Sequence, residues 1–242
     1  MHIPVGFPLV AKTEKSTDPK TQKAKRRRPV SKHAVCQEVI KQAVTNRIPL
    51  RFVRFDVWFA SAETMVFMKE KPKRDVICPL KTNRKVALSQ ADKQRGRYVR
   101  VDTLEWEAHA SQIISLEGVS LPLVLVKQVF THEDGRVGLR SLVSSDTTLS
   151  FAHLTTTYHE RWPVACYHKS LKQHGSLAKS PTQTVTTQTN HFFAALCGFV
   201  KLERLKMRTT LHHFALQSTL YLNALRSAFA TLRTLTPVQG SA

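Results

Sequence analysis

Apolar and polar residues alternate in short runs along the first third of the chain, and the pattern predicts strands and helices in turn. A period of two is typical of strands, whereas apolar residues three or four positions apart are typical of helices. On this basis we predict strands at residues 2–12, 48–61 and 74–88, and helices at 32–46 and 61–71. Strands and helices in this order favour an α/β sheet.

The strand predicted at 48–61 leads to an acidic residue, Asp56, which is followed by Trp58. Two interpretations fit this aspartate. It is either a residue that caps a turn where a strand ends, or a functional carboxylate placed at the carboxyl end of a strand.

The segment at 89–150 has a different pattern, with strand-like runs at 98–106, 120–130 and 137–145 separated by turn-forming residues. We interpret it as an antiparallel β-rich insertion. Helical periodicity then continues to the end of the chain, and we predict helices at 155–174, 187–207 and 210–235. The expected organisation is a first part at 1–88, the insertion at 89–150 and a helical part at 151–242.

The net charge of the chain indicates what kind of molecule it binds. The 242 residues include 37 Lys and Arg against 17 Asp and Glu, a formal net charge of +20. Such an excess favours a polyanion, above all a nucleic acid. No apolar run reaches the ~18 residues of a membrane span, and the first residues lack the pattern of a secretory signal. We therefore expect a cytosolic protein.

Familiar enzyme and metal motifs are missing from the sequence. The four cysteines are far apart and form no C-x-x-C pair, so reduced thiols are expected rather than a zinc site or disulfides. The sequence also has no Gly-rich phosphate loop, G-x-S-x-G or H-E-x-x-H motif. We assign no role to His191, His212 and His213.

Basic residues gather at two further places. The run Lys23–Arg28 lies in a polar segment predicted as a loop, where it either contacts phosphates, serves as a nuclear address or is simply solvated. Lys81, Asn83 and Arg84 follow the strand predicted at 74–88, in a basic turn.

The helix predicted at 155–174 carries the densest set of candidate side chains. On one continuous helix, Tyr158, Arg161, position 165 and Lys172 fall within an arc of about 60°. A tyrosine, an arginine and a lysine on one face suit a DNA backbone and an unstacked base. An ordinary amphipathic helix with a hydrated basic face, and with Trp162 packed beneath it, is the alternative.

The spacing Y-x2-R-x3-A-x6-K in this helix resembles the Tyr-Arg-Glu-Lys signature of DDE transposases from bacterial insertion sequences, with Ala165 in place of the glutamate. The segments "RFDVWFASAE", "ICPLKTNRKVALS", "HKSLKQ" and "KLERLK" resemble the same family. The similarity extends from about Ile3 to Leu235.

The resemblance implies a ribonuclease H-like core, in which three acids hold two Mg²⁺ or Mn²⁺ ions for phosphoryl transfer on DNA. Asp56 matches the second acid, and the third would stand at Ala165. The first acid belongs to a strand before the one predicted at 2–12, so we expect an N-terminally truncated chain that lacks the first core strand. Lys81, Asn83 and Arg84 match a basic segment near the active-site groove, although a solvated turn also fits.

Three functional interpretations follow. The first is a transposase remnant in the bacterial cytoplasm and nucleoid, with DNA as partner, a homodimeric state and no strand cleavage, because one acid remains. The second is a non-catalytic DNA-binding protein that occupies transposon ends and competes with intact transposase. The third is a relic that does not fold, because the loss of a central strand removes core area and exposes a sheet edge.

Overall fold

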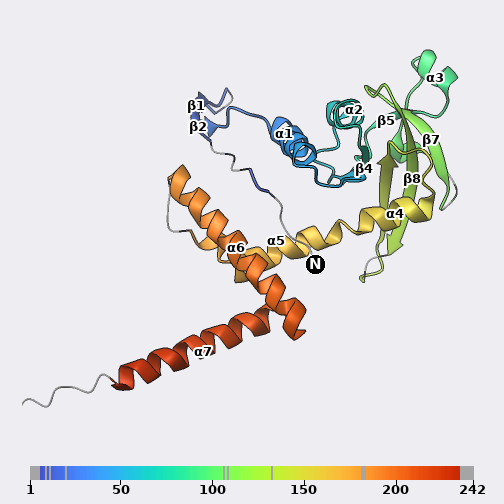
Figure 1. The fold of residues 1–242 in the computed structure, drawn as a ribbon. Coiled ribbons are helices and arrows are strands. Elements are labelled where there is room, and N and C mark those ends of the chain that lie inside the picture. The colour runs from blue at the N-terminus through green and yellow to red at the C-terminus, as the bar shows by residue number, and fades with distance from the viewer. Residues whose placement is uncertain are drawn as a thin grey trace, which may run out of the picture. The chain divides into compact units, whose positions relative to one another are not determined.

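The computed structural model describes residues 6–8, 10, 12–19, 21–105, 107, 109–131, 133–180 and 184–234. The chain forms two compact units (Figure 1). One extends from Gly6 to Trp162, and the other comprises the described residues from Pro163 onward. No helix among the described residues is both long and apolar enough to cross a membrane.

The first unit is built on a seven-stranded sheet with the order β3-β4-β9-β8-β7-β5-β6. Its strands are β3 (Phe52–Arg54), β4 (Asp75–Leu80), β5 (Lys85–Ala87), β6 (Val99–Arg100), β7 (Ser111–Leu116), β8 (Pro122–Thr131) and β9 (Val137–Ser144). Strands β3 and β4 are parallel, and the other pairs are antiparallel. The prediction of a mixed α/β fold is therefore confirmed. The β-rich segment continues this sheet directly, because β9 pairs with β4.

Helices cover both faces of the sheet. Along β4, Val76 and Cys78 enter one apolar cluster and Ile77 enters the other, as the period of two requires. The first cluster is closed by α1 (Lys32–Thr45) and α2 (Ala62–Glu70), and the second by α4 (Phe151–His159). Figure 1 shows α4 lying across the strands. The unit therefore has three layers, with helix, sheet and helix.

Helix α1 confirms the helix predicted at 32–46, and it begins at Ser31, whose hydroxyl accepts the Ala34 N–H at 3.0 Å. Helix α2 has the same start, since the Ser61 hydroxyl accepts the Thr64 N–H at 3.1 Å. A short helix, α3 (Gln90–Gln94), and a 3₁₀ turn, η1 (Val101–Thr103), were not predicted. The sequence pattern also missed β7.

The N-terminal segment differs from the prediction. The described residues of 2–12 belong to no strand, and the others lie outside the described residues. The segment predicted as a loop instead contains an antiparallel hairpin of β1 (Glu14–Thr17) and β2 (Ala24–Arg27), whose side chains are almost all exposed. Because neither strand buries an apolar face, hydrophobic alternation does not reveal them.

The predicted strand at 48–61 was too long. Strand β3 ends at Arg54, and the chain turns at residues 57–59. The turn is stabilised by Asp56, whose carboxylate oxygen Oδ1 accepts the Trp58 N–H at 2.7 Å. A side chain that bonds to the backbone two residues later favours a turn over an extended strand.

The second unit is helical. It contains α5 (Trp162–His174), which starts at the last residue of the first unit, then η2 (Leu177–Lys179), α6 (Val185–Thr209) and α7 (His213–Thr234). Leu171, Ala195 and Phe199 form its small core. The predicted helices at 187–207 and 210–235 are confirmed within the described residues.

Candidate functional site

Asp56 lies just beyond the carboxyl end of β3 and is half-buried. Its Oδ1 atom holds the turn through the Trp58 N–H, and its main-chain carbonyl accepts the Phe59 N–H at 3.2 Å. Within the described part of the chain, no hydrogen bond reaches its second carboxylate oxygen. Asp56 therefore fits both sequence interpretations, because it organises a turn and still presents one carboxylate oxygen.

Lys81, Asn83 and Arg84 lie at the same edge of the sheet, directly after β4. Since β3 and β4 are parallel, the segments that follow them meet at one edge. Lys81 confirms this closeness, because its ammonium nitrogen lies 5.9 Å from the centre of the exposed Trp58 ring. This is within the range of a cation–π interaction.

The turn that carries this basic segment has a backbone fixed by hydrogen bonds. The Arg84 N–H donates to the Lys81 carbonyl at 3.1 Å, and the Arg84 carbonyl accepts the Val101 N–H at 2.9 Å. Beneath it, burial raises the pKa of the Cys78 thiol to about 12, against a smaller opposite effect of the Arg84 charge. Cys78 is therefore a protonated core residue and not a nucleophile.

The single helix predicted over 155–174 is wrong. Helix α4 ends at His159, and α5 begins at Trp162. Pro163 explains the break, because proline lacks an N–H and is tolerated in the first turn of a helix but not in its interior. Tyr158 and Lys172 therefore belong to different helices, and the arc of about 60° calculated for one helix does not exist.

Tyr158 is a core residue of the first unit. Its side chain is 7% exposed and packs against the sheet in the cluster of Ile77 and Leu154. Two guanidinium groups lie near its ring, that of Arg161 at 5.6 Å and that of Arg140 at 5.8 Å from the ring centre. Both guanidinium groups are therefore within the range of a cation–π interaction with the Tyr158 ring. Trp162, which the alternative interpretation placed beneath the helix, is 68% exposed.

Arg54 adds a contact that the sequence did not suggest. Its guanidinium lies 2.6 Å from the Glu160 carboxylate and donates to the Thr157 carbonyl at 2.7 Å. Arg54 is the last residue of β3 and precedes Asp56 by two residues, so this ion pair joins the end of β3 to the end of α4. The Glu160 carboxylate is thus held by Arg54.

A comparison with protein families decides the identity of the chain. Residues 12–214 match the model of the family described as "Archaeal putative transposase ISC1217", a DDE-type transposase family. This chain belongs to that transposase family. No curated protein matches the chain significantly.

DDE transposases generally use Mg²⁺ or Mn²⁺, so the donor set beside Asp56 matters. Hard cations of this kind need several oxygen ligands, and a two-metal centre needs carboxylates from more than one element. Among the described residues of this transposase, no group of three or more His, Cys, Asp or Glu side chains is arranged to hold a metal ion. The described residues therefore do not form the three-acid centre that a two-metal mechanism needs.

The remaining predicted residues lie in the second unit of the transposase. Ala165 and Lys172 are both exposed on α5. Ala165 offers a methyl group where the signature has a glutamate, and so it supplies no metal ligand. Lys172 has no ion pair among the described residues, which leaves its charge available to an anion.

A buried polar network joins the three long helices of the second unit, and no sequence pattern indicated it. His213 of α7 lies between Ser170 of α5 and Glu203 of α6, with Nδ1 2.5 Å from the serine Oγ and Nε2 2.9 Å from a carboxylate oxygen. Burial lowers the pKa of His213, although the nearby Glu203 charge raises it. A neutral imidazole can accept the Ser170 hydroxyl at Nδ1, whereas Nε2 lies close to the Glu203 carboxylate without a well-aligned hydrogen bond.

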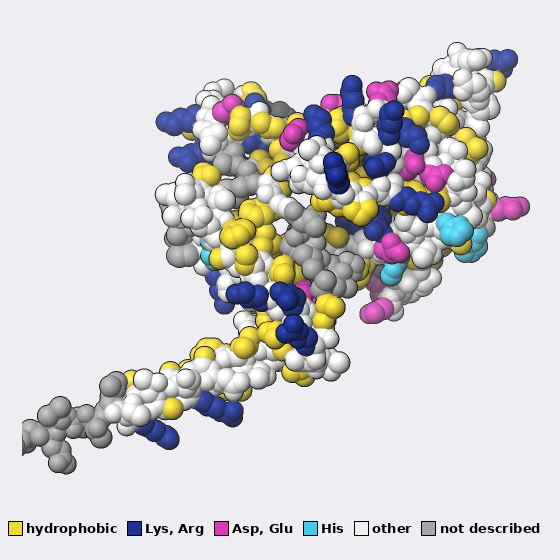
Figure 2. Space-filling model, in the orientation of Figure 1, with side chains coloured by type: hydrophobic (Ala, Val, Ile, Leu, Met, Phe, Trp, Pro, Cys, Tyr) yellow, Lys and Arg dark blue, Asp and Glu magenta, His cyan; other side chains and the backbone are white. Residues whose placement is uncertain are grey.

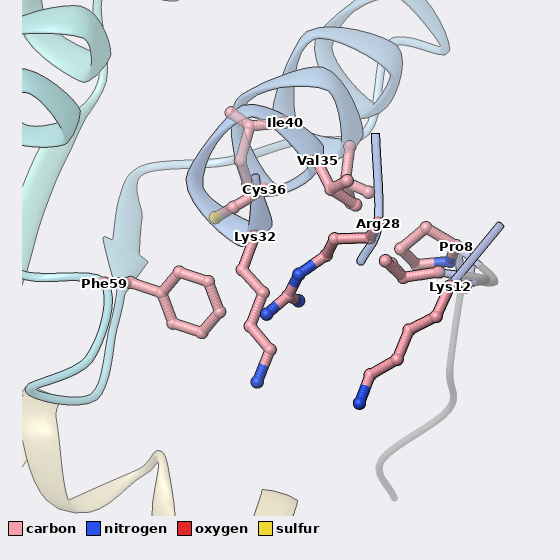
Figure 3. A pocket seen from close by; sticks show the side chains of 10 residues that line it. Pro8, Lys12, Arg28, Lys32, Val35, Cys36, Ile40 and Phe59 are labelled. Carbon is pink, nitrogen blue, oxygen red and sulfur yellow. The ribbon is translucent and has the colours of Figure 1, made fainter. Parts of the chain in front are cut away.

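A cavity of about 690 Å³ opens beside the Asp56 turn, and Figure 3 shows its lining. Phe59, three residues after Asp56, forms one wall, and Val35 and Ile40 of α1 form the apolar floor. Three cations complete the lining: Lys12, Arg28 and Lys32. No acidic side chain is among the described lining residues, so the cavity carries a positive charge without a counter-ion.

Proposed function

We propose that this transposase family member binds DNA through its basic surface and does not cut it. The observation that supports this most is the gathering of cations at the Asp56 edge. Lys81 and Arg84 lie in the turn next to it, and the lining of the neighbouring cavity contains three more cations. Cations can hold phosphates without metal, but activating a nucleophile between two metals needs more acids.

We further propose that β3, α2 and β4 belong to a ribonuclease H-like core. Two parallel strands joined through a helix, with an acid at the carboxyl end of the first, support this interpretation. Such a core needs one more strand beside β3 to carry its first acid. Among the described residues β3 pairs with β4 alone, so its other edge is available to that strand.

Arg161, Lys172, Lys81, Asn83 and Arg84 are the proposed DNA contacts, and Tyr158 is proposed to position Arg161. An arginine whose guanidinium lies over a buried ring loses less freedom when it binds a phosphate. Replacing Arg161 or Lys172 with glutamine removes one phosphate contact, and each change should lower the salt dependence of DNA binding by about 0.9. Unchanged salt dependence in both variants would mean that these cations are only solvated.

A second function has some support. A chain without catalysis still occupies transposon ends if it recognises their sequence, and it then competes with an intact transposase. The cations of this chain, and the lack of a metal-binding cluster among its described residues, fit such a role equally well. Competition binding between a duplex with the element's inverted repeat and a random duplex separates the two, since specific binding should exceed random binding by at least about a thousandfold.

We also propose that α7 forms a homodimer interface. Four large apolar side chains on it are more than a third exposed and follow a spacing of three and four residues: Leu222, Leu225, Phe229 and Leu232. That spacing is typical of paired helices. Light scattering after chromatography should give twice the chain mass, and Leu225→Arg should give the monomer mass. A monomeric wild-type chain at micromolar concentration would contradict the proposal.

A further inference from the structure

The hairpin of β1 and β2 contributes nothing to the core. Its eight residues are exposed except for Ser16, which is half-buried, and the two strands pair only with each other. An isolated two-stranded ribbon is marginal in water. Packing therefore does not explain the hairpin, and any role that it has lies on its surface.

The surface of the hairpin is strongly basic. The described residues from Lys12 to Lys32 include eight Lys and Arg side chains and two acids, Glu14 and Asp18. Figure 2 shows Lys and Arg side chains projecting from this region. A large part of the net charge of the chain is thus concentrated in this short segment.

The two faces of the hairpin differ in charge. Residues directly opposite each other across an antiparallel pair lie on the same face. On one face Arg27 is opposite Glu14, and Lys25, the next residue on that face, pairs with Asp18 at 2.7 Å. The formal charges of these four side chains therefore sum to zero, and two of them, Lys25 and Asp18, form an ion pair.

The other face carries Lys15 opposite Arg26. Like charges at directly opposite positions destabilise a strand pair. Neither side chain has an ion pair among the described residues. The repulsion between Lys15 and Arg26 weakens the hairpin when no ligand is bound. An anion that contacts both cations removes this repulsion.

We propose that this face, defined by Lys15 and Arg26, binds the phosphate backbone of DNA. The inference rests on the proposed function, which supplies DNA as the polyanion. A two-stranded ribbon fits the major groove, which is about 12 Å wide, and a strand of this length spans about 13 Å. The ribbon is therefore about as long as the groove is wide, so cations on one face reach its phosphates.

Three more cations lie where the hairpin joins the rest of the first unit. Lys12 precedes β1, Arg28 follows β2 and Lys32 begins α1. In Figure 3 the charged ends of these three side chains extend into the opening of the cavity beside Phe59. They have no ion pairs among the described residues. The path of cations therefore leads from the hairpin to the turn that contains Asp56.

The test is the salt dependence of binding to a short random duplex, followed by fluorescence anisotropy. Each phosphate contact should contribute about 0.9 to the slope of log affinity against log salt, or about 3.5-fold in affinity between roughly 50 and 200 mM salt. Lys15→Gln and Arg26→Gln should each lower the slope by about 0.9. Arg27→Gln is the matched control, because it removes the same charge from the neighbouring position on the face whose formal charges sum to zero, and it should leave the slope nearly unchanged.

Lys15→Glu separates a loss of DNA contact from a loss of the hairpin itself. This change places opposite charges across the strands and so favours the hairpin, yet it should weaken DNA binding more than Lys15→Gln does. Equal slopes for Arg26→Gln and Arg27→Gln would refute a DNA-binding face. Wild-type protein that binds no DNA at low salt would refute the proposed function itself, which is a different outcome.

Discussion

Replacing Tyr158 distinguishes a core residue from a DNA-stacking residue. Its side chain is 7% exposed among apolar residues of the sheet and α4. Removing a buried aromatic ring costs about 3–5 kcal/mol, because the ring no longer packs against its neighbours and a cavity remains. The same change removes the cation–π interactions with Arg140 and Arg161, worth about 0.5–1 kcal/mol each at partly exposed sites.

Tyr158→Ala should therefore lower the free energy of unfolding of the first unit by about 4 kcal/mol and its melting temperature by about 10 °C. Tyr158→Phe keeps the ring, so it should change the stability by less than about 1.5 kcal/mol. Urea unfolding followed by circular dichroism gives these values.

Trp162→Ala is the control for the removal of an aromatic ring, because Trp162 is 68% exposed and its replacement should change stability by no more than about 0.5 kcal/mol. A Tyr158→Ala protein with the wild-type urea midpoint but weaker DNA binding would refute the reasoning. In that case Tyr158 would act at the surface, as the single-helix prediction required.

The other predictions concern thiols and pH. A thiol reagent at about pH 8 should modify the exposed Cys166 and Cys197 first, and Cys78 only after unfolding, because burial raises the Cys78 pKa to about 12; rapid labelling of Cys78 would contradict its place in the core. Burial lowers the pKa of His213, so the unfolded chain takes up a proton at a higher pH than the folded chain. The stability that depends on His213 is present in full above about pH 7.5 and declines as the pH falls through about 6.5. The urea midpoint should drop between about pH 8 and 5.5 more in the wild type than in His213→Phe, and an equal drop would argue against the network.

The sequence predicted the helices and strands around Asp56, because their signals are local. Ser31 and Ser61 start helices, and apolar alternation in β3 and β4 identifies two buried strands with helix α2 between them. Because β3 and β4 are parallel, Asp56 and Lys81, which follow them, lie at the same edge of the sheet. This part of the candidate site follows from the order of elements alone.

The sequence failed where tertiary contacts outweigh local pattern. Tyr158 and Lys172 have a helical spacing in the sequence, but the helix is interrupted before Pro163, so the two residues lie on different helices. Tyr158 is also buried and therefore belongs to the core. The hairpin has no apolar face to detect. His213 carried no local signal either, because its partners Ser170 and Glu203 belong to other helices and meet it only after three helices pack.

A plasmid cleavage assay can show whether this transposase family member binds DNA without cutting it. Purified wild-type chain and Asp56→Asn are incubated with supercoiled plasmid in Mg²⁺ and in Mn²⁺, at a salt concentration where anisotropy confirms DNA binding. We predict that the plasmid remains supercoiled with both proteins, since the described residues contain no three-acid centre to hold two metals. Nicking by the wild type that requires the divalent ion and disappears in Asp56→Asn would mean that the chain cuts DNA and that Asp56 takes part.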